Sequence, residues 1–73
     1  MNPLNPKKLL LSKWTAVKPT RKEKHFLVTN VIEPDPPEFR IEWVEIQAVY
    51  SRRTTRIHWR ELQDDAAWLL GWL

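Results

Sequence analysis

Five tryptophans in a chain of 73 residues, with no cysteine and a single glycine, constrain the fold more than any other feature of the sequence. Trp14, Trp43, Trp59, Trp68 and Trp72 are spread along the chain. A buried tryptophan removes about 150–250 Å² of surface from water, and its indole N–H usually finds a hydrogen-bond partner. Five such side chains can fill the core of a very short chain. They could alternatively form an aromatic surface for ligand stacking, but the sequence supports a core role better.

The length and composition predict one small domain over residues 1–73. Without cysteine the chain has neither a disulfide nor a thiolate metal site, and only His25 and His58 remain as nitrogen ligands. We therefore expect no metal and no cofactor. The longest apolar run, three leucines at 9–11, is far too short to cross a bilayer, which favours a soluble, cytoplasmic protein.

Charge is distributed unevenly along the chain. Residues 1–24 carry seven basic residues against the single acid Glu23, a net of +6. The remaining residues carry five arginines against eight acids, a net of −3. This asymmetry favours an anionic partner, nucleic acid above all. The alternative is a solvated segment that only increases solubility.

The first half of the chain predicts a helical turn followed by two strands. Asn5-Pro6 is typical of a helix start and predicts a short helical turn over 7–11, which must dock through Leu9, Leu10 or both. Strands are predicted over 12–17 and 24–33, with a turn at 18–22 between them.

The second half predicts a proline-rich loop and a long bent strand. Pro34–Pro37 cannot donate ladder hydrogen bonds and predicts a stiff loop. The strand predicted over 39–50 changes the phase of its apolar alternation near Trp43-Val44, which predicts a β-bulge or sharp coil there. A final strand over 54–60 is predicted to pair antiparallel with it, with Tyr50 opposite Thr55.

Residues 63–72 predict a compact tryptophan-rich helix, which Asp64 would cap and Gly71 would end. Trp68 and Trp72 would then act as lids over the open sheet. The predicted fold class is α+β: a bent antiparallel sheet of three or four strands, partly barrel-like, with a short N-terminal helical turn and this C-terminal helix.

Several strings of the sequence resemble one known family. They are Ser12–Val17 (SKWTAV), Lys22–Thr29 (KEKHFLVT), Ala48–Arg53 (AVYSRR), Trp59–Leu62 (WREL) and the ending Trp68…Gly71-Trp72. Together they resemble the small tryptophan-rich family of uncharacterised bacterial and cyanobacterial proteins. The resemblance covers nearly the whole chain and is weakest over Pro34–Pro37. It implies a self-contained bacterial domain but no particular activity, cofactor or binding residue.

We find no arrangement of residues that predicts an enzyme. Gly71 is the only glycine, so no glycine-rich phosphate loop exists. Neither Ser12 nor Ser51 lies in a recognisable nucleophile context. His25 lies at a predicted strand start, where a structural role is favoured over acid–base chemistry.

The leading hypothesis is binding of single-stranded RNA or DNA through the basic N-terminal segment. Basic side chains would follow the phosphates while an exposed tryptophan stacks on a base, Trp14 being preferred over Trp43. The candidate nucleic-acid-binding residues are Lys7, Lys8, Lys13, Trp14, Arg21, Lys22 and Lys24.

The alternative hypothesis is a protein-interaction or self-associating module without enzymatic activity. Edge strands of an open sheet accept partner strands, and Trp, Tyr and Arg are common interface anchors. The Arg52-Arg53 turn and the Pro34–Pro37 loop would border such a surface. Salt separates the two hypotheses, because phosphate binding weakens steeply with salt and a tryptophan-centred protein interface weakens little.

Overall fold

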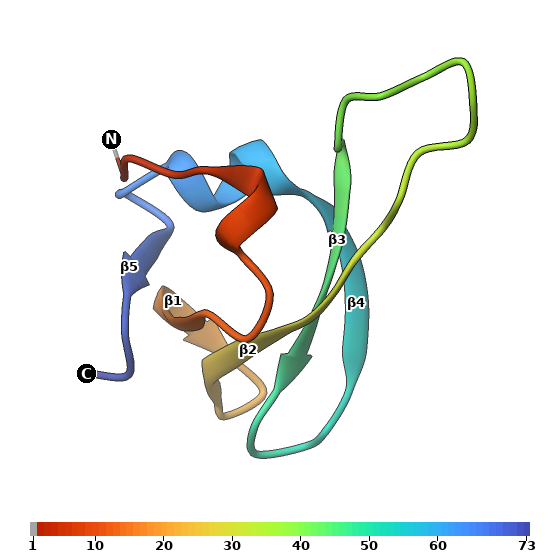
Figure 1. The fold of residues 1–73 in the computed structure, drawn as a ribbon. Helices are drawn as coiled ribbons and strands as arrows, with labels where there is room; N and C mark the ends of the chain where they lie inside the picture. Colours follow the sequence, from red (N-terminus) through yellow and green to blue (C-terminus); the bar gives the residue numbers. More distant parts are fainter. Residues whose placement is uncertain (1) are drawn as a thin grey trace.

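A five-stranded antiparallel sheet and two short 3-10 helices make up the fold in the computed structural model, which describes residues 2–73. The strands are β1 (Lys13–Thr20), β2 (Glu23–Val31), β3 (Trp43–Ala48), β4 (Thr54–His58) and β5 (Trp68–Leu70), and the helices are η1 (Pro6–Lys8) and η2 (Trp59–Gln63). The strand order is β4-β3-β2-β1-β5, so β4 and β5 are the edges of an open sheet (Figure 1).

The core lies on one face of the sheet, beneath the two 3-10 helices. Apolar residues alternate along β2 and β3, so every second side chain points to that face. Leu9, just after η1, and Leu62, within η2, cover it from above. The buried apolar residues are Leu9, Trp14, Phe26, Val28, Val44, Ile46, Ala48, Trp59 and Leu62.

The predicted N-terminal helical turn is present but shorter than expected. It is the three-residue helix η1, in which the Asn5 side chain accepts a hydrogen bond from the Lys7 N–H and Pro6 occupies the first turn. Leu9 docks on the core with 3% of its surface exposed, whereas Leu10 is exposed. Helix η1 is therefore held by one leucine and its asparagine cap.

The prediction of an α+β fold closed by a C-terminal helix is wrong. Within the predicted 63–72 helix, residues 68–70 form the edge strand β5 instead, with Trp14 opposite Leu70 and Ala16 opposite Trp68. Asp64 follows η2 as its C-cap and accepts a hydrogen bond from the Ala66 N–H in a turn, rather than capping the start of a helix. A helix of this length is marginal alone, and pairing with the open edge of β1 satisfies the same backbone groups while Trp68 packs on the core.

The sheet has five strands and is not closed, which corrects the expected three- or four-stranded, partly barrel-like sheet. The irregularity expected near Trp43-Val44 lies elsewhere: β3 starts at Trp43, and the register shift of the β2–β3 pairing is in β2, between Val28 and Asn30. The phase change in the sequence therefore marks where the loop ends and the strand begins.

The predicted pairing of β3 with β4 is displaced along the strands. Thr55 lies opposite Ile46 and Ile57 opposite Val44, whereas the sequence placed Thr55 opposite Tyr50. Trp59 is not a strand residue at all, because it begins η2. The displacement is an even number of residues, so each side chain keeps its predicted face.

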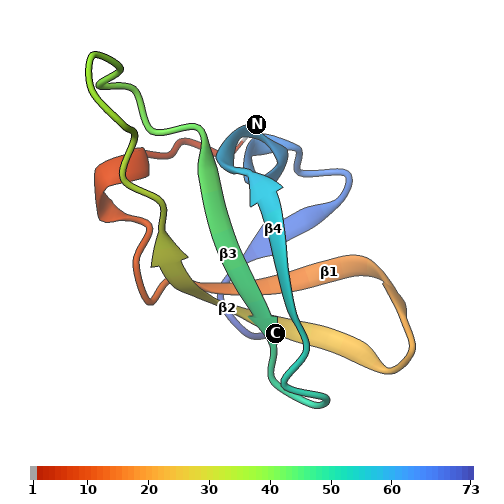
Figure 2. The ribbon, with the colours of Figure 1, turned by 90° about the vertical axis from the view of Figure 1, so that its right-hand side faces the viewer.

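Two long features extend from opposite ends of β2. The first is the β1–β2 hairpin, which turns at Arg21 and Lys22, both with positive φ. This turn is shorter than the turn predicted at 18–22. The other is the loop of residues 32–42, which holds the proline-rich stretch and projects from the opposite end of the molecule (Figure 2). Among residues 2–73, neither helix has the length and apolarity that crossing a membrane requires.

Candidate nucleic-acid interface

Trp72 and Lys13 form an aromatic–cationic contact on the sheet face opposite the core. The Lys13 Nζ lies 4.8 Å from the centroid of the Trp72 ring, and the His25 ring lies 6.0 Å from it at a tilt of 33°. Trp72 remains 41% exposed. A lysine at this distance from an indole is held by cation–π attraction.

The C-terminal residues reach this face by a sharp turn at Gly71, whose φ is +88°. The Gly71 N–H donates to the Lys13 carbonyl (2.7 Å), and Thr15 Oγ1 donates to the Gly71 carbonyl (2.6 Å). The Trp72 indole N–H donates to the Phe26 carbonyl (2.9 Å). These bonds bind the tail across β1 and β2, so Trp72 has a defined position. The predicted helix from which Trp72 was expected to cover the open sheet is absent, and Trp72 instead reaches the sheet from the turn after β5.

Trp14 is not the exposed stacking residue that we predicted. It has no exposed surface, and its indole N–H donates to Ser12 Oγ (2.9 Å). Because Trp14 is on the core side of β1, a base could reach it only by opening the sheet. Trp43, the lesser candidate, is 43% exposed and lies with its ring 5.5 Å from that of His58.

The predicted basic residues do not form one continuous surface. Lys7 and Lys8 lie on η1, outside the hairpin. Lys13 is in register with Leu27, whereas Lys24 shares strand parity with Phe26, so Lys13 and Lys24 lie on opposite faces of the sheet. Arg21 and Lys22 lie at the hairpin turn, where both are exposed.

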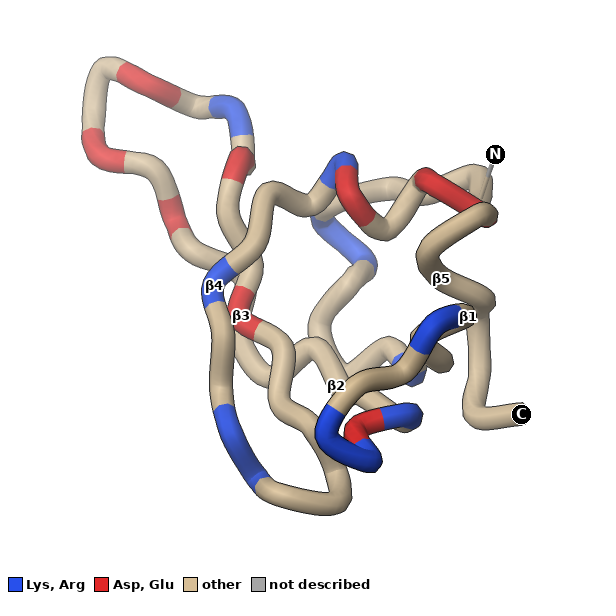
Figure 3. The backbone as a smooth tube through the Cα atoms, turned by 180° about the vertical axis from the view of Figure 1, so that it is seen from behind, with Lys and Arg blue, Asp and Glu red and all other residues tan. Residues whose placement is uncertain are grey.

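Charge is nevertheless segregated between the two ends of the molecule. The β1–β2 hairpin, residues 13–31, carries five basic residues and one acid, whereas the 32–42 loop carries four acids and one arginine. Figure 3 shows the blue segments around the hairpin turn and the red segments along the loop. An anionic strand would therefore meet an attractive potential at the hairpin and a repulsive one at the loop.

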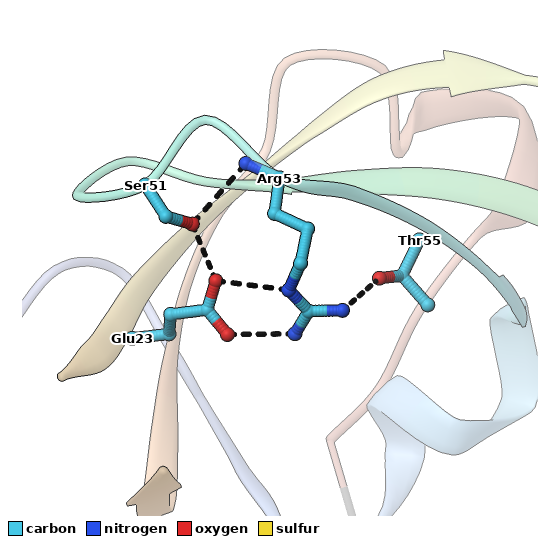
Figure 4. Close-up of polar contacts among 4 residues, drawn as sticks. All are labelled: Glu23, Ser51, Arg53 and Thr55. Atoms are coloured by element: carbon cyan, nitrogen blue, oxygen red, sulfur yellow. Dashed lines mark hydrogen bonds and ion pairs between the residues drawn. The ribbon is translucent and has the colours of Figure 1, made fainter. Parts of the chain in front are cut away.

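The single acid of the hairpin, Glu23, is neutralised by partners from the β3–β4 turn. Its side chain is 2% exposed and accepts hydrogen bonds from Arg53 Nη2 (2.6 Å) and Arg53 Nε (3.1 Å), as well as from the Ser51 hydroxyl (Figure 4). Hydrogen bonds from Arg53, which have the larger effect, and from Ser51 lower the pKa of Glu23 to about 2. The third guanidinium nitrogen of Arg53, Nη1, donates to Thr55 Oγ1 (3.1 Å). Glu23 thus leaves the positive charge of the hairpin uncompensated, and Arg53, whose side chain is 46% exposed, is paired with it at the surface.

Sequence reasoning missed Trp72 and His25 as members of this surface. Trp72 was assigned to a helix, and nothing local to residues 68–72 shows that they pair with β1. The one usable signal is Gly71, since glycine is the usual residue where the chain reverses through a left-handed conformation.

The chain is thus a small domain that consists of an open antiparallel sheet with tryptophans in its core. The model of the tryptophan-rich protein family (DUF2389) matches residues 12–73, and the chain belongs to this family, as its motifs suggested. No curated protein and no solved structure matches it. Residues 2–73 contain no cluster of three or more His, Cys, Asp or Glu side chains placed to hold a metal ion.

Proposed function

We propose that the protein binds single-stranded nucleic acid through the β1–β2 hairpin and Trp72. The observation that carries the proposal is the Lys13–Trp72 pair: a cation 4.8 Å from the centroid of an indole that is 41% exposed. Proteins that bind single strands combine basic side chains along the backbone with aromatic rings on which bases stack. The pair supplies one of each in adjacent positions.

The hairpin extends this pair toward its turn. Arg21 and Lys22 are exposed there, and Glu23 is held by Arg53 rather than opposing them. A strand that places one base on Trp72 can run along β1 with its phosphates near these side chains. Such binding is sequence-tolerant, because every base has a π face. We expect this protein in the bacterial cytoplasm, which contains both RNA and DNA as ligands.

The experiment compares two half-exposed tryptophans with one oligonucleotide. Trp72→Ala should weaken binding of a short single strand by at least about fivefold, because a base–aromatic stack is worth roughly 1–3 kcal/mol. Trp43→Ala is the matched control, since Trp43 is 43% exposed but lies on β3 beside His58. Fluorescence anisotropy at low salt measures both, and thermal melts check that each variant folds.

Equal affinities of the two variants would contradict the proposal. So would binding that does not change between low and moderate salt, because phosphate contacts release counterions. Light scattering on the same samples tests the alternative of self-association. If Trp72 is protected in a dimer that forms as the protein concentration rises, the role of this face would be self-association and not nucleic-acid binding.

A further inference from the structure

A depression of about 440 Å³ lies between three segments that are distant in sequence. Helix η1 contributes Pro6 and Lys7, the 32–42 loop contributes Phe39, Arg40, Ile41 and Glu42, and the β4–η2 junction contributes His58, Trp59 and Arg60. It shares no residue with the Trp72 surface. Its volume lies within the range of about 300–1,000 Å³ that is usual for small-ligand sites.

The tryptophan and the phenylalanine that line the depression each have an arginine beside the ring. The Arg60 Cζ lies 5.2 Å from the Trp59 ring centroid, and the Arg40 Cζ lies 6.0 Å from the Phe39 ring centroid. Both rings line the depression, and Trp59 is buried whereas Phe39 is 81% exposed. Guanidinium groups next to aromatic rings present a flat apolar surface and a positive charge together.

The charge of the lining favours an anion. Lys7, Arg40 and Arg60 oppose one acid, Glu42, and none of these three basic residues forms an ion pair within residues 2–73. Arg40 also borders a second depression, which is lined by Glu33, Asp35 and Glu38. An anionic group is therefore better placed toward Lys7 and Arg60, away from those acids.

His58 fixes this side of the depression. Its Nδ1 accepts a hydrogen bond from the Arg60 backbone N–H (3.2 Å), and the Glu61 carboxylate accepts from the His58 backbone N–H (3.2 Å). This capping box sets the start of η2, and with it the positions of Trp59 and Arg60. Arg60 is thus carried on a backbone held by reciprocal hydrogen bonds.

We propose that this depression binds a nucleoside monophosphate, with the base against Phe39 and Trp59 and the phosphate at Lys7 and Arg60. A planar ring matches the two aromatic side chains of the lining, and a dianionic phosphate matches the cations Lys7 and Arg60 better than a monoanion does. The site does not depend on the proposed nucleic-acid interface, because the two have no residue in common.

The test is an NMR titration of the labelled full chain with AMP, adenosine and inorganic phosphate. AMP should shift the Trp59 indole N–H and the backbone amides near Arg60 in a saturable way. Adenosine and phosphate should each bind at least about fivefold more weakly, because each lacks one half of the contacts. Phosphate that binds as tightly as AMP, or AMP that shifts no signal of Trp59, would overturn the proposal.

Two exposed aromatic residues provide matched variants. Phe39→Ala should weaken AMP binding by at least about fivefold. Tyr50→Ala should leave it unchanged, since Tyr50 is 69% exposed and lies outside the depression. Both side chains are too exposed for their removal to unfold the chain. Equal AMP affinity of the two variants would refute the site.

Further arms separate this site from the proposed interface and identify the source of the nucleotide. Trp72→Ala should leave AMP affinity unchanged whatever its effect on oligonucleotides, and a loss of AMP binding in that variant would count against a separate site. A 5′-phosphorylated oligonucleotide that displaces AMP would assign the site to strand ends. Failure of that oligonucleotide to compete would assign it to free nucleotide.

Discussion

Glu23 is the side chain whose surroundings differ most from those of an ordinary surface acid. It is buried beside Arg53 and Ser51, which come from a turn some thirty positions later in the chain. Its carboxylate satisfies two Arg53 N–H groups in a bidentate pair, a geometry that specifies orientation as well as charge. The contact fixes the β3–β4 turn against the start of β2.

This environment predicts a pH dependence of stability. The pKa of Glu23 is about 2 in the fold and 4.5 as an ordinary value, so between these values the unfolded chain binds more protons. The contribution of Glu23 is therefore complete above pH 4.5 and is lost as the pH falls toward 2. Urea titrations across this range should show the free energy of unfolding falling with acid in the natural chain.

Two substitutions isolate the contribution of Glu23. Glu23→Gln should lower stability at neutral pH and make the acid-dependent decline shallower, because the ion pair with Arg53 is gone. Glu38→Gln, on the exposed loop, should leave the decline as it is. An unchanged slope in Glu23→Gln would show that Glu23 titrates normally in the fold.

At the scale of elements, β5 and the tail after it decide which face Trp72 occupies. Three residues of β5 pair with β1, and Gly71 then turns the chain. After the turn, Thr15 Oγ1 donates to the Gly71 carbonyl and the Trp72 indole N–H donates to the Phe26 carbonyl. The left-handed glycine was expected from the sequence, but as the end of a helix. The left-handed conformation of Gly71 was predictable because it depends on neighbouring residues, whereas the strand that this glycine contacts was not predictable.

Gly71→Ala should therefore destabilise the protein by about 1–2 kcal/mol, which is the cost of a left-handed backbone with a Cβ. Steric clash adds nothing, because no atom lies within 4 Å of where that Cβ would be. Gly71→Asn should cost less, since asparagine tolerates this conformation better. Chemical denaturation measures both. A loss of stability in Gly71→Ala that is no larger than the loss in Gly71→Asn would show that the left-handed backbone is not what requires glycine at this position.

At the scale of the whole molecule, the separation of charge is the feature most relevant to binding. The basic hairpin and the acidic 32–42 loop leave β2 at opposite ends, so the molecule has a positive and a negative pole (Figures 2 and 3). A charged ligand is oriented by such a field before it makes contact. The net charge of +3 conceals this arrangement.

Salt-dependent oligonucleotide binding tests which pole acts. Lys13→Gln combined with Lys22→Gln should reduce the slope of log K against log salt by about 1.4, at about 0.7 for each lost phosphate contact on a single strand. Neutralising Glu33, Asp35 and Glu38 to glutamine should leave the slope unchanged, because those side chains lie at the other pole. An equal change of slope in both variants would indicate net charge rather than a located surface.

The sequence by itself determined the features that depend on neighbouring residues. Alternation of apolar side chains predicted the antiparallel strands, Asn5-Pro6 the capped turn, Gly71 a left-handed residue, and the tryptophan motifs the family. Only the tertiary structure decided that residues 68–70 are a strand, that Trp14 is buried while Trp72 is exposed, and that Glu23 meets Arg53. Each of these depends on a partner about thirty to sixty residues away, and local periodicity does not specify which distant edge or side chain that partner will be.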